Sequence, residues 1–445
     1  MDSTAREDGV VVIGGGFAGL AAAWDLTRRG IPVTVLEADA TVGGLAGGYE
    51  VGGEILEKFY HHWFNNDLHI QNFVRELGYG DRIVEHESRT GLYYVNTIFR
   101  LSKPTDVLKF KALSIVGRFR LGILALLARR VRNWRKLESV TARDWLIQLG
   151  GAEVYRVVWE PLLRGKFGRY AEQISAVWFW NKLCLRGGSR DTSGREVLVY
   201  LQGGFLAFAE AVAAQIEKAG GKVLTNTAAT GLEVRGGRVH GVTTAAGVVP
   251  CSTVIATPAL PILADIFEGA FDPAYIAQLR KIEYLANMCL VLELDRPLSD
   301  TYWINVNDAN FPFVGIIEHT NFESAKSYGG RHVVYLSKYL PADHELYGFG
   351  DEQFLNYAVP FIKQIFPQFE ESWILRYKLW RADYAQPVVG LHYSQLIPPT
   401  KSPVAGVYVA TMAQIYPEDR GTNYAVREGR AVAALVAADR AAQTA

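Results

Sequence analysis

Residues 10–37 read VVVIGGGFAGLAAAWDLTRRGIPVTVLE, and this stretch decides the fold. An apolar, β-branched run ends in Gly14-x-Gly16-x-x-Gly19 and passes directly into an alanine-rich helical pattern. A second β-type run then ends in Glu37. This strand–turn–helix–strand order with a terminal acid predicts a Rossmann-like dinucleotide-binding unit in an α/β fold.

Each glycine of the motif has a physical role. Gly14 permits the tight turn, Gly16 lets backbone N–H groups approach a pyrophosphate, and Gly19 lets the helix pack close to the sheet. The positive end of the helix dipole then faces the phosphates. Glu37 lies 18 residues after Gly19 and is placed to accept hydrogen bonds from a ribose. The predicted cofactor-binding residues of this unit are Gly14, Gly16, Phe17, Ala18, Gly19, Glu37 and Ala38. The alternative is a glycine-rich turn in an α/β fold that binds no ligand.

A second glycine pair, Gly43-Gly44, follows Glu37 by a few residues, which suits close backbone approach to an extended cofactor. With this pair, the chain resembles the flavoprotein superfamily that contains amine oxidases, protoporphyrinogen oxidase, phytoene desaturases and UDP-galactopyranose mutase. The resemblance is dense over residues 10–65, 203–258 and 404–436. It implies FAD as the cofactor, with Gly43, Gly44 and Leu45 lying along it.

The resemblance also implies where the rest of the FAD is held. The backbone near Val223 would contact the adenine, and the strand that ends at Thr257 would run under the cofactor. The N-terminus of the last helix would present Gly421 and Thr422 N–H groups to the flavin pyrimidine edge. Arg420 would stabilise the negative charge of the reduced flavin. The alternative for Arg420 is a surface arginine paired with Glu418 or Asp419.

Length and composition set the domain organisation. The chain has 445 residues, 49% of them hydrophobic, which predicts two or three lobes. The expected fold class is α/β, a Rossmann-like FAD-binding domain (GR2-type) with an inserted α+β substrate domain. The FAD-binding domain is assigned to 1–85, 200–285 and 396–445, a helical region to 86–199, and the substrate-domain sheet to 286–395.

Local patterns predict individual elements within these parts. Helical patterning follows a β-type segment at 91–101 and continues to about residue 180, with a cap at Thr141 and breaks at Gly150-Gly151 and Pro161. A hairpin turns at Gly236-Gly237. Further helices are expected over 203–220, 352–366 and 423–439, and strands over 222–226, 254–258, 288–294, 313–318, 332–339 and 406–411.

Charge and cysteine content exclude some classes of function. The formal net charge is zero, so no global field attracts nucleic acid. The three cysteines are scattered and predict neither a disulfide framework nor a metal site. No signal peptide precedes the first strand, and the longest apolar run near the middle, residues 121–128, is too short to span a bilayer. We therefore expect a cytoplasmic protein.

One segment has a strongly uneven charge. Residues 103–136 contain ten Lys or Arg residues and one acid, Asp106, beside apolar helical stretches. A basic amphipathic region of this kind can lie on an anionic membrane surface, which would make the protein peripheral to the inner face of the membrane. The alternative is an ordinary helix pair whose arginines are solvated or paired.

Several side chains are candidates for catalysis or substrate binding. His61 and His62 lie in a stretch similar to one beside the flavin in UDP-galactopyranose mutase, and either could carry a proton. The alternative is a core histidine bonded to a carbonyl. The predicted substrate-binding residues are Glu318, His319, Asn321, Tyr384 and Tyr416. For the 318–321 cluster, a strand-end turn with local hydrogen bonds is an equal alternative.

Three functions remain open at this point. The leading one is an FAD-dependent oxidoreductase that takes a hydride from a C–H or C–N bond onto flavin N5. The second is a non-redox flavoenzyme like UDP-galactopyranose mutase, acting on a nucleotide-linked or lipid-linked sugar. The third is a membrane-surface protein acting on a lipid or polyprenyl-linked substrate. The substrate is thus a small or lipid-linked molecule, and the oligomeric state is not predicted.

Overall fold

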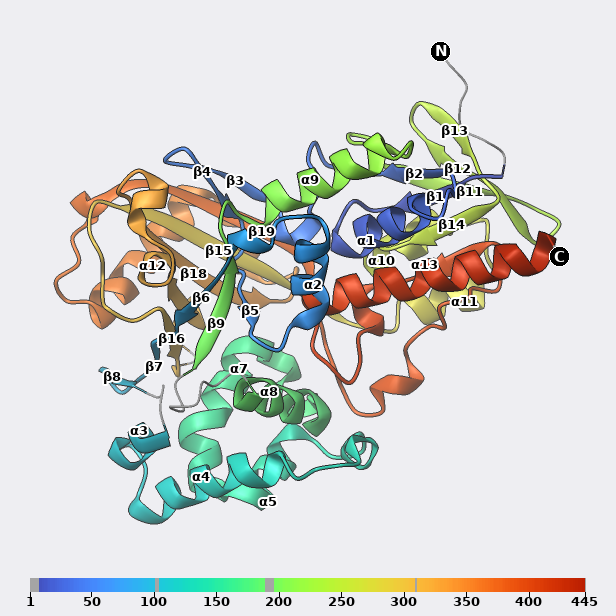
Figure 1. Ribbon diagram of the computed structural model, residues 1–445. Coiled ribbons are helices and arrows are strands. Elements are labelled where there is room, and N and C mark those ends of the chain that lie inside the picture. The colour runs from blue at the N-terminus through green and yellow to red at the C-terminus, as the bar shows by residue number, and fades with distance from the viewer. Residues whose placement is uncertain (1–7, 101–103, 189–195, 309, 445) are drawn as a thin grey trace.

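The computed structural model describes residues 8–100, 104–188, 196–308 and 310–444. The chain forms three parts that meet near the middle of the molecule (Figure 1). A nucleotide-binding lobe holds the N- and C-terminal segments, a mixed β-sheet forms a second lobe, and a helical region lies against both. Lys103 of the predicted basic segment lies outside the described residues.

A parallel five-stranded sheet forms the centre of the nucleotide-binding lobe. Val10 and Val12 of its central strand pack against three helices on one face, whereas Val11 and Ile13 pack against further strands and a helix on the other. Because both faces of this strand are buried, its sequence is an unbroken apolar run. In sheet order the strands are β10 (Lys222–Leu224), β2 (Val33–Leu36), β1 (Val10–Ile13), β14 (Thr253–Ala256) and β20 (Val407–Val409).

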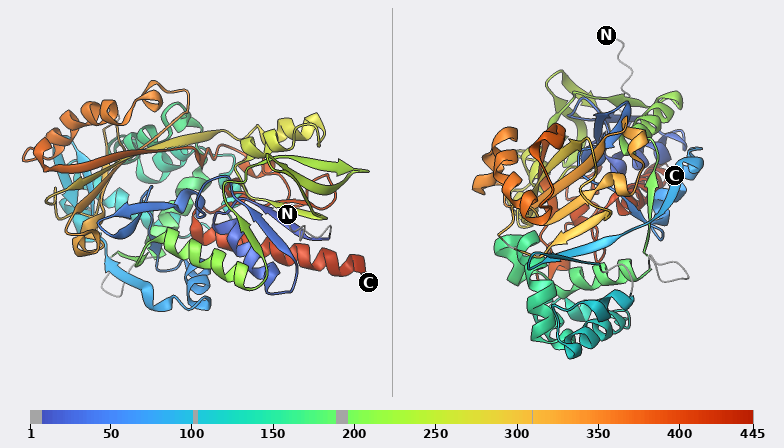
Figure 2. Two further views of the ribbon diagram at one scale, coloured as in Figure 1. Left: turned by 90° about the horizontal axis from the view of Figure 1, so that it is seen from above. Right: turned by 90° about the vertical axis from the view of Figure 1, so that its left-hand side faces the viewer.

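Helices and a small antiparallel sheet cover the two faces (Figure 2). One face carries α1 (Phe17–Thr27), α9 (Phe205–Lys218) and α13 (Thr422–Thr444), with α2 (Leu68–Glu76) against α13. The other face carries β11 (Ala229–Arg235), β12 (Arg238–Thr244), β13 (Gly247–Pro250), α10 (Leu260–Ile266) and α11 (Pro273–Leu279). The hairpin predicted at Gly236-Gly237 is confirmed, with positive φ at both glycines.

A seven-stranded sheet forms the second lobe. Its order is β19 (Ile374–Pro387), β15 (Tyr284–Leu294), β18 (His332–Leu340), β17 (Gly315–Glu318), β16 (Trp303–Val306), β7 (Thr90–Tyr94) and β8 (Thr97–Arg100). The helix α12 (Asp351–Ile365) packs on it. The single β-type segment predicted at 91–101 is instead a hairpin, because Val95 and Asn96 turn with positive φ. The segment 86–199 therefore contributes two strands to this sheet as well as helices.

The helical region consists of α3 (Pro104–Lys109), α4 (Ile115–Ala128), α5 (Ala142–Gly150), α6 (Ala152–Val154), α7 (Glu160–Phe167) and α8 (Ala176–Gly188). Thr141 caps α5 by accepting from the Asp144 N–H at 3.0 Å, as predicted. The predicted break at Pro161 is wrong. Helical residues continue without a break from Ala152 to Phe167, and Pro161 lies directly after the π-helical turn Tyr155–Trp159.

Two small sheets join the lobes, the hairpin β3 (Gly48–Val51) with β4 (Glu54–Glu57) and the set β5 (Trp63–Phe64), β9 (Val197–Leu201) and β6 (Ile83–Glu87). The buried Glu57 side chain accepts from the Phe205 N–H at 2.8 Å and from the Tyr200 hydroxyl at 3.0 Å. Burial raises the pKa of Glu57 to about 7, although these hydrogen bonds oppose the change. One carboxyl group thus caps α9 and ties it to the linking strands.

Two negative findings concern membranes and metals. Across the described ranges, no helix combines the length and the apolar character that crossing a bilayer requires. Within the same part of the chain, no three His, Cys, Asp or Glu side chains gather as a metal site would need.

The tightest contact in the nucleotide-binding lobe is between α1 and α13. A Cβ on Gly429 would lie 2.2 Å from the Ala18 carbonyl oxygen. We expect Gly429→Ala to lower the free energy of unfolding by about 1–3 kcal/mol, because the helices must move apart. Gly122→Ala is the matched control on the exposed face of α4, where a Cβ would meet no atom within 4 Å. It should raise stability by up to about 1 kcal/mol. Urea denaturation measures the free energy of unfolding of both variants. Equal changes in the two variants would contradict the packing argument.

Candidate active site

The carboxyl ends of the parallel strands meet at one edge of the sheet, where the first glycine motif lies. A Cβ on Gly14 would lie 2.4 Å from the Thr257 hydroxyl, and one on Gly19 would lie 2.0 Å from the Gly14 carbonyl oxygen. The Thr257 hydroxyl donates to the Ile13 carbonyl at 2.8 Å, which ties the ends of β1 and β14 together. These contacts explain why both glycines are required.

The N-terminus of α1 is open for an anion. Its N-cap is Gly16, and no side chain caps the helix. A Cβ on Gly16 would meet no atom within 4 Å, so space lies directly in front of the first N–H groups, including those of Phe17 and Ala18. This combination of free N–H donors, helix dipole and space fits a pyrophosphate.

Glu37 is held rigidly at the end of β2. One carboxylate oxygen accepts from the Gly15 N–H at 2.6 Å and the other from the Asp39 N–H at 2.8 Å. The Glu37 N–H donates to the Leu224 carbonyl at 2.8 Å, so β10 with Val223 lies beside the acid. Ala38 follows directly. The geometry suits a ribose at Glu37 and an adenine near Val223.

The second glycine pair packs against the first motif. Gly43 and Gly44 have φ of +106° and +56° and open a short 3₁₀ turn, Gly44–Ala46, that includes Leu45. The Gly43 N–H donates to the Gly15 carbonyl at 2.9 Å, and a Cβ on Gly44 would lie 3.4 Å from the Gly16 Cα. The positive φ at both positions therefore favours glycine whether or not a cofactor lies alongside.

The N-terminus of α13 lies beside the 57–67 segment. The Thr422 hydroxyl oxygen accepts from the Trp63 indole N–H at 2.8 Å, and the Asn423 side chain accepts from the Ile70 N–H at 3.2 Å. A Cβ on Gly421 would meet no atom within 4 Å. The first N–H groups of α13 thus face open space, as the negative edge of a reduced flavin would require.

A buried carboxylate, Asp419, gathers polar groups from three parts of the fold next to this helix. It forms an ion pair with Lys182 and accepts from the Trp178 indole N–H at 3.1 Å and from the Gln386 amide at 3.2 Å. Burial alone would raise its pKa, but the neighbouring cations outweigh burial and hold the pKa well below its usual range. Lys182 and Trp178 come from α8 and Gln386 from β19. Sequence reasoning missed this cluster.

Lys166 of α7 is the unusual member of the cluster. Its ammonium lies over the rings of Trp178 at 4.7 Å and Tyr339 at 4.9 Å. Within the described ranges, it forms neither a hydrogen bond nor an ion pair. Burial lowers its pKa to about 7, with Asp419 opposing and the two nearby cations adding to the decrease.

Arg420 is a partly buried residue of the same cluster. Its guanidinium donates to the Tyr339 hydroxyl at 2.8 Å, and its Nε is buried without a hydrogen-bond partner among the described residues. Of the two acids considered as partners of Arg420, Glu418 pairs with Arg427 at 3.0 Å instead. Asp419 supplies the compensating charge from inside the protein.

The two candidate histidines have different surroundings. The His61 Nδ1 lies 2.6 Å from the Phe59 carbonyl oxygen, and burial lowers its pKa to about 4, with the charge of Arg420 adding to the decrease. His62 lies 2.9 Å from the Tyr302 hydroxyl, within a group of aromatic rings. His61 therefore lies within the electrostatic range of Arg420, whereas His62 packs in an aromatic cluster.

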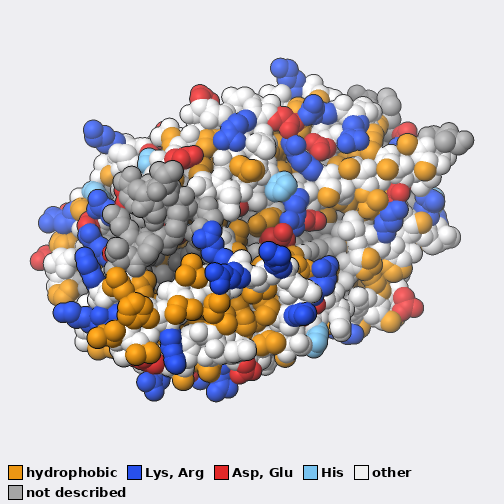
Figure 3. All heavy atoms as spheres, turned by 60° about the horizontal axis from the view of Figure 1, so that its bottom comes forward, with side chains coloured by type: hydrophobic (Ala, Val, Ile, Leu, Met, Phe, Trp, Pro, Cys, Tyr) orange, Lys and Arg blue, Asp and Glu red, His pale blue; other side chains and the backbone are white. Residues whose placement is uncertain are grey.

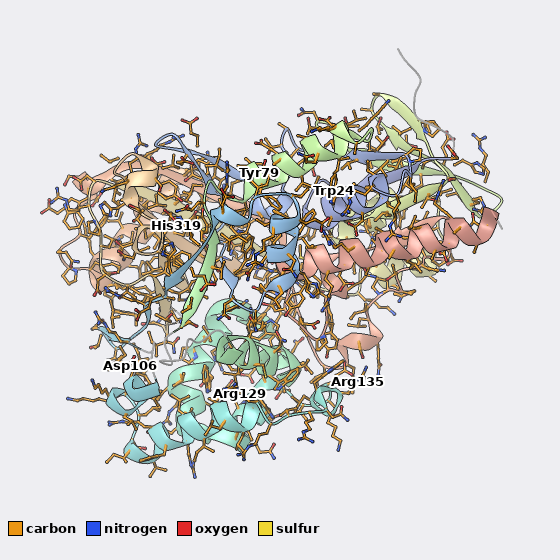
Figure 4. The ribbon with its side chains drawn as sticks, viewed as in Figure 1. Trp24, Tyr79, Asp106, Arg129, Arg135 and His319 are labelled. Atoms are coloured by element: carbon orange, nitrogen blue, oxygen red, sulfur yellow. The ribbon has the colours of Figure 1, made fainter. Side chains whose placement is uncertain are left out.

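The 318–321 cluster has internal partners. Glu318 accepts from the N–H groups of Leu298 at 2.8 Å and Ser299 at 2.9 Å, and Asn321 donates to the carbonyl of Ser299. His319 is 1% exposed and lies 2.7 Å from the Tyr328 hydroxyl, inside the sheet lobe (Figure 4). Burial lowers the pKa of His319 to about 4 and raises that of Glu318 to about 7. The geometry favours the strand-end alternative over a role in substrate binding.

The two predicted tyrosines also lie apart from the cluster. Tyr384 packs edge-on against Tyr284 at 5.6 Å. The Tyr416 hydroxyl donates to Glu138 at 2.8 Å, and its ring packs against Trp134, which ties the C-terminal loop to the helical region. Their roles in substrate binding stay predictions.

A family model described as flavin containing amine oxidoreductase matches residues 17–437. The chain belongs to this family.

Three solved structures illustrate the fold. A proposed protoporphyrinogen oxidase from Exiguobacterium sp. 255-15 has TM-score 0.76 and 17% identity, over 97% of this chain and 99% of that one. Reduced UDP-galactopyranose mutase has TM-score 0.76 and 15% identity, over 97% and 94%. Wild-type putrescine oxidase bound to putrescine has TM-score 0.70 and 17% identity, over 97% and 99%. A search of curated proteins finds no match.

This flavin amine oxidoreductase is an FAD-dependent oxidoreductase. The residues present fit FAD. The α1 N-terminus would hold the pyrophosphate, Glu37 the ribose, and the α13 N-terminus with Arg420 the flavin edge that becomes negative on reduction. The predicted superfamily, fold class and cofactor are thus confirmed.

Asp419 provides a test of the cluster. We expect Asp419→Asn to cost about 2–4 kcal/mol in the free energy of unfolding, because it leaves partly buried cations without their buried carboxylate. Glu418→Gln in the same loop should cost under about 1 kcal/mol, since its pair with Arg427 is partly exposed. Chemical denaturation measures both. Comparable losses would show that Asp419 does not hold the cluster together.

Proposed function

We propose that this enzyme oxidises a C–H or C–N bond of an anionic organic substrate by hydride transfer. The chemistry that FAD supplies when bound is acceptance of the hydride, with its electron pair, at flavin N5; dioxygen or another two-electron acceptor then reoxidises it. The substrate would give up a hydride, which carries two electrons, and one further proton, which would pass to solvent. The protein supplies orientation, charge and control of access.

The proposed substrate class rests on the net positive charge of the cluster around Asp419. Lys166, Lys182 and Arg420 surround one carboxylate, and that carboxylate already pairs with Lys182. A second acid, Asp67, is within electrostatic range of Lys182 and accepts from the Phe64 N–H at 2.8 Å. An alkylammonium substrate would meet uncompensated positive charge here. A carboxylate or phosphate would supply the acceptor that the Lys166 ammonium lacks.

Arg420 and the α13 N-terminus support the same chemistry. The α13 N-terminus faces open space at Gly421, and Arg420 adds a positive charge whose Nε has no hydrogen-bond partner among the described residues. In a desolvated setting, fixed charges stabilise developing negative charge strongly. His61 contributes differently. Its Nδ1–H donates to the Phe59 carbonyl, which leaves Nε2 as an acceptor, and with a pKa of about 4 the ring is neutral at pH 7. This favours a hydrogen-bonding role for His61 over proton carriage.

The first experiment is an anaerobic visible spectrum of the FAD-loaded enzyme. We expect the oxidised flavin band to bleach when a fraction of anionic metabolites is added, and to persist when a cationic amine fraction of equal concentration is added. Readmission of dioxygen or addition of an artificial acceptor should restore the band. Bleaching by the amines alone would contradict the proposed substrate class. Absence of bleaching by either fraction would contradict the oxidation.

A second experiment separates substrate binding from turnover. Benzoate and benzylamine are matched probes, and perturbation of the oxidised flavin spectrum reports their Kd. We expect benzoate affinity to fall about tenfold or more from pH 6 to pH 8.5, because Lys166 loses its proton as pH rises through its pKa of about 7. A bound anion raises the pKa of Lys166. Benzoate affinity is therefore highest below the pKa of the free enzyme, about 7, and falls as the pH rises above that value. The other groups facing Lys166 are Asp419, Lys182, Arg420 and Tyr339.

Two variants control this experiment. Lys166→Met should bind benzoate weakly at pH 6 and show little pH dependence. Arg164→Met lies on the same helix, but Arg164 is exposed and pairs with Glu160 and Glu172, so benzoate binding should be unchanged. If Lys166→Met kept the pH dependence of the wild type, Lys166 would not be the anion-binding group.

A second function draws on the same observation. A cationic cluster beside a flavin site also suits the pyrophosphate of a nucleotide-linked sugar, and a UDP-galactopyranose mutase is among the similar folds. In that case, isomerisation of a nucleotide sugar would require chemically reduced enzyme and would consume no electron acceptor. Activity of this kind, with no bleaching of the oxidised enzyme, would favour the mutase.

A further inference from the structure

Exposed hydrophobic side chains concentrate on the helical region. Of the fourteen large hydrophobic side chains that are strongly exposed among the described residues, six lie within residues 108–126, each 50–69% exposed. They are Leu108, Ile115, Val116, Phe119, Ile123 and Leu126. In the space-filling view, hydrophobic side chains gather over this region, with Lys and Arg around them (Figure 3). We call the outward side of α3 and α4 the α3–α4 face.

The helix α4 has two apolar faces on opposite sides. Leu121, Leu124 and Ala128 are buried and pack within the helical region. The five exposed apolar residues of α4 fall within an arc of roughly 100° on the other side, at 3.6 residues per turn. A helix needs one apolar face to join a core. The second face therefore requires an apolar environment that lies outside the described chain.

Basic side chains surround the exposed face. The described part of residues 104–136 contains nine Lys and Arg residues, and none of them forms an ion pair with a described acid. They are Lys109, Lys111, Arg118, Arg120, Arg129, Arg130, Arg132, Arg135 and Lys136. Arg118 donates to the carbonyls of Leu113 and Leu108, which holds its cation at the edge of the apolar residues. Asp106, Arg129 and Arg135 lie along this region in Figure 4.

We propose that the α3–α4 face docks on a bilayer that contains anionic phospholipid. The apolar arc would enter the boundary between headgroups and acyl chains, and the basic side chains would meet lipid phosphates. A second copy of this chain is a poorer occupant. A two-fold contact would bring nine cations of one copy against nine of the other. The proposal does not depend on the reaction that the enzyme catalyses.

The test is co-sedimentation of the full-length, FAD-loaded protein with sucrose-filled vesicles. The probes are phosphatidylcholine alone and phosphatidylcholine with 30% phosphatidylglycerol. At about 0.1 M salt, we expect the partition coefficient to be at least about tenfold higher on the anionic vesicles. Raising the salt to about 0.5 M should lower binding to the anionic vesicles several-fold by screening.

Matched variants separate the two contributions. Phe119→Ser with Ile123→Ser should reduce the partition coefficient about tenfold or more, because both side chains lose apolar contact with lipid. Arg129→Gln with Arg130→Gln should reduce binding on anionic vesicles while leaving the weak binding to phosphatidylcholine unchanged. The control is Val248→Ser with Leu375→Ser, which removes two exposed apolar side chains elsewhere and should leave binding unchanged. Thermal melting and the flavin spectrum verify folding of each variant.

Three results would overturn the proposal. One is absence of wild-type binding to anionic vesicles at 0.1 M salt. Another is equal binding of wild type and the Phe119→Ser, Ile123→Ser variant while both are folded. The third is a wild-type dimer in size-exclusion chromatography that this variant loses, since the face would then be an interface between copies of the chain.

Discussion

One buried carboxylate, that of Asp419, holds together the parts of the fold that meet at the candidate site. It pairs with Lys182 and accepts from Trp178, which fixes the helical region, and it accepts from Gln386, which fixes the edge of the sheet lobe. Partial burial of several cations in one place costs free energy unless a negative charge compensates them. A single carboxylate offsets this cost in part and leaves the cluster positive. The same feature therefore organises the interior and determines which ligand charge suits it.

The cofactor framework has a different physical basis, which is close approach of backbone to backbone. Gly19 lies against the Gly14 carbonyl, and Gly429 against the Ala18 carbonyl. Any side chain at these two positions would force helices or turns apart, whereas Gly43 and Gly44 are favoured by their positive φ. Because the glycines leave the α1 N-terminus open and Glu37 fixed by two N–H groups, the shape of the FAD site is set by backbone geometry.

This difference explains how much could be predicted from the sequence. The FAD framework depends on contacts within residues 10–45 and on a strand and a helix with strong local patterns, so motif and periodicity predicted it. Thr141 as a cap and the Gly236-Gly237 turn were predictable for the same local reason. The Asp419 cluster was not. Its members come from α7, α8, β19 and a loop, and no short pattern marks residues that meet only in the folded chain.

The polar group at 318–321 illustrates the same limit. A dense polar cluster after a strand is compatible with substrate binding and equally with a strand-end turn. In the fold, Glu318 and Asn321 find their hydrogen-bond partners in the 298–301 turn, as buried polar groups must. Lys166 is the contrasting case. It lies among aromatic rings with no acceptor in the described chain, which is costly unless a ligand supplies one. Satisfied and unsatisfied polar groups look alike in a sequence, and only the fold separates them.

The helical region connects the two proposals physically. The Trp180 indole of α8 donates to the Ala128 carbonyl at the end of α4, while Lys182 of α8 pairs with Asp419. One layer of helix thus separates an exposed apolar face from a positively charged interior site. A small hydrophilic amine suits neither environment, because it gains nothing from lipid and meets like charge inside. If both proposals hold, an amphiphile with one anionic group would suit both environments: its apolar part would partition into the bilayer at the α3–α4 face, and its charge would be complementary to the cluster around Asp419.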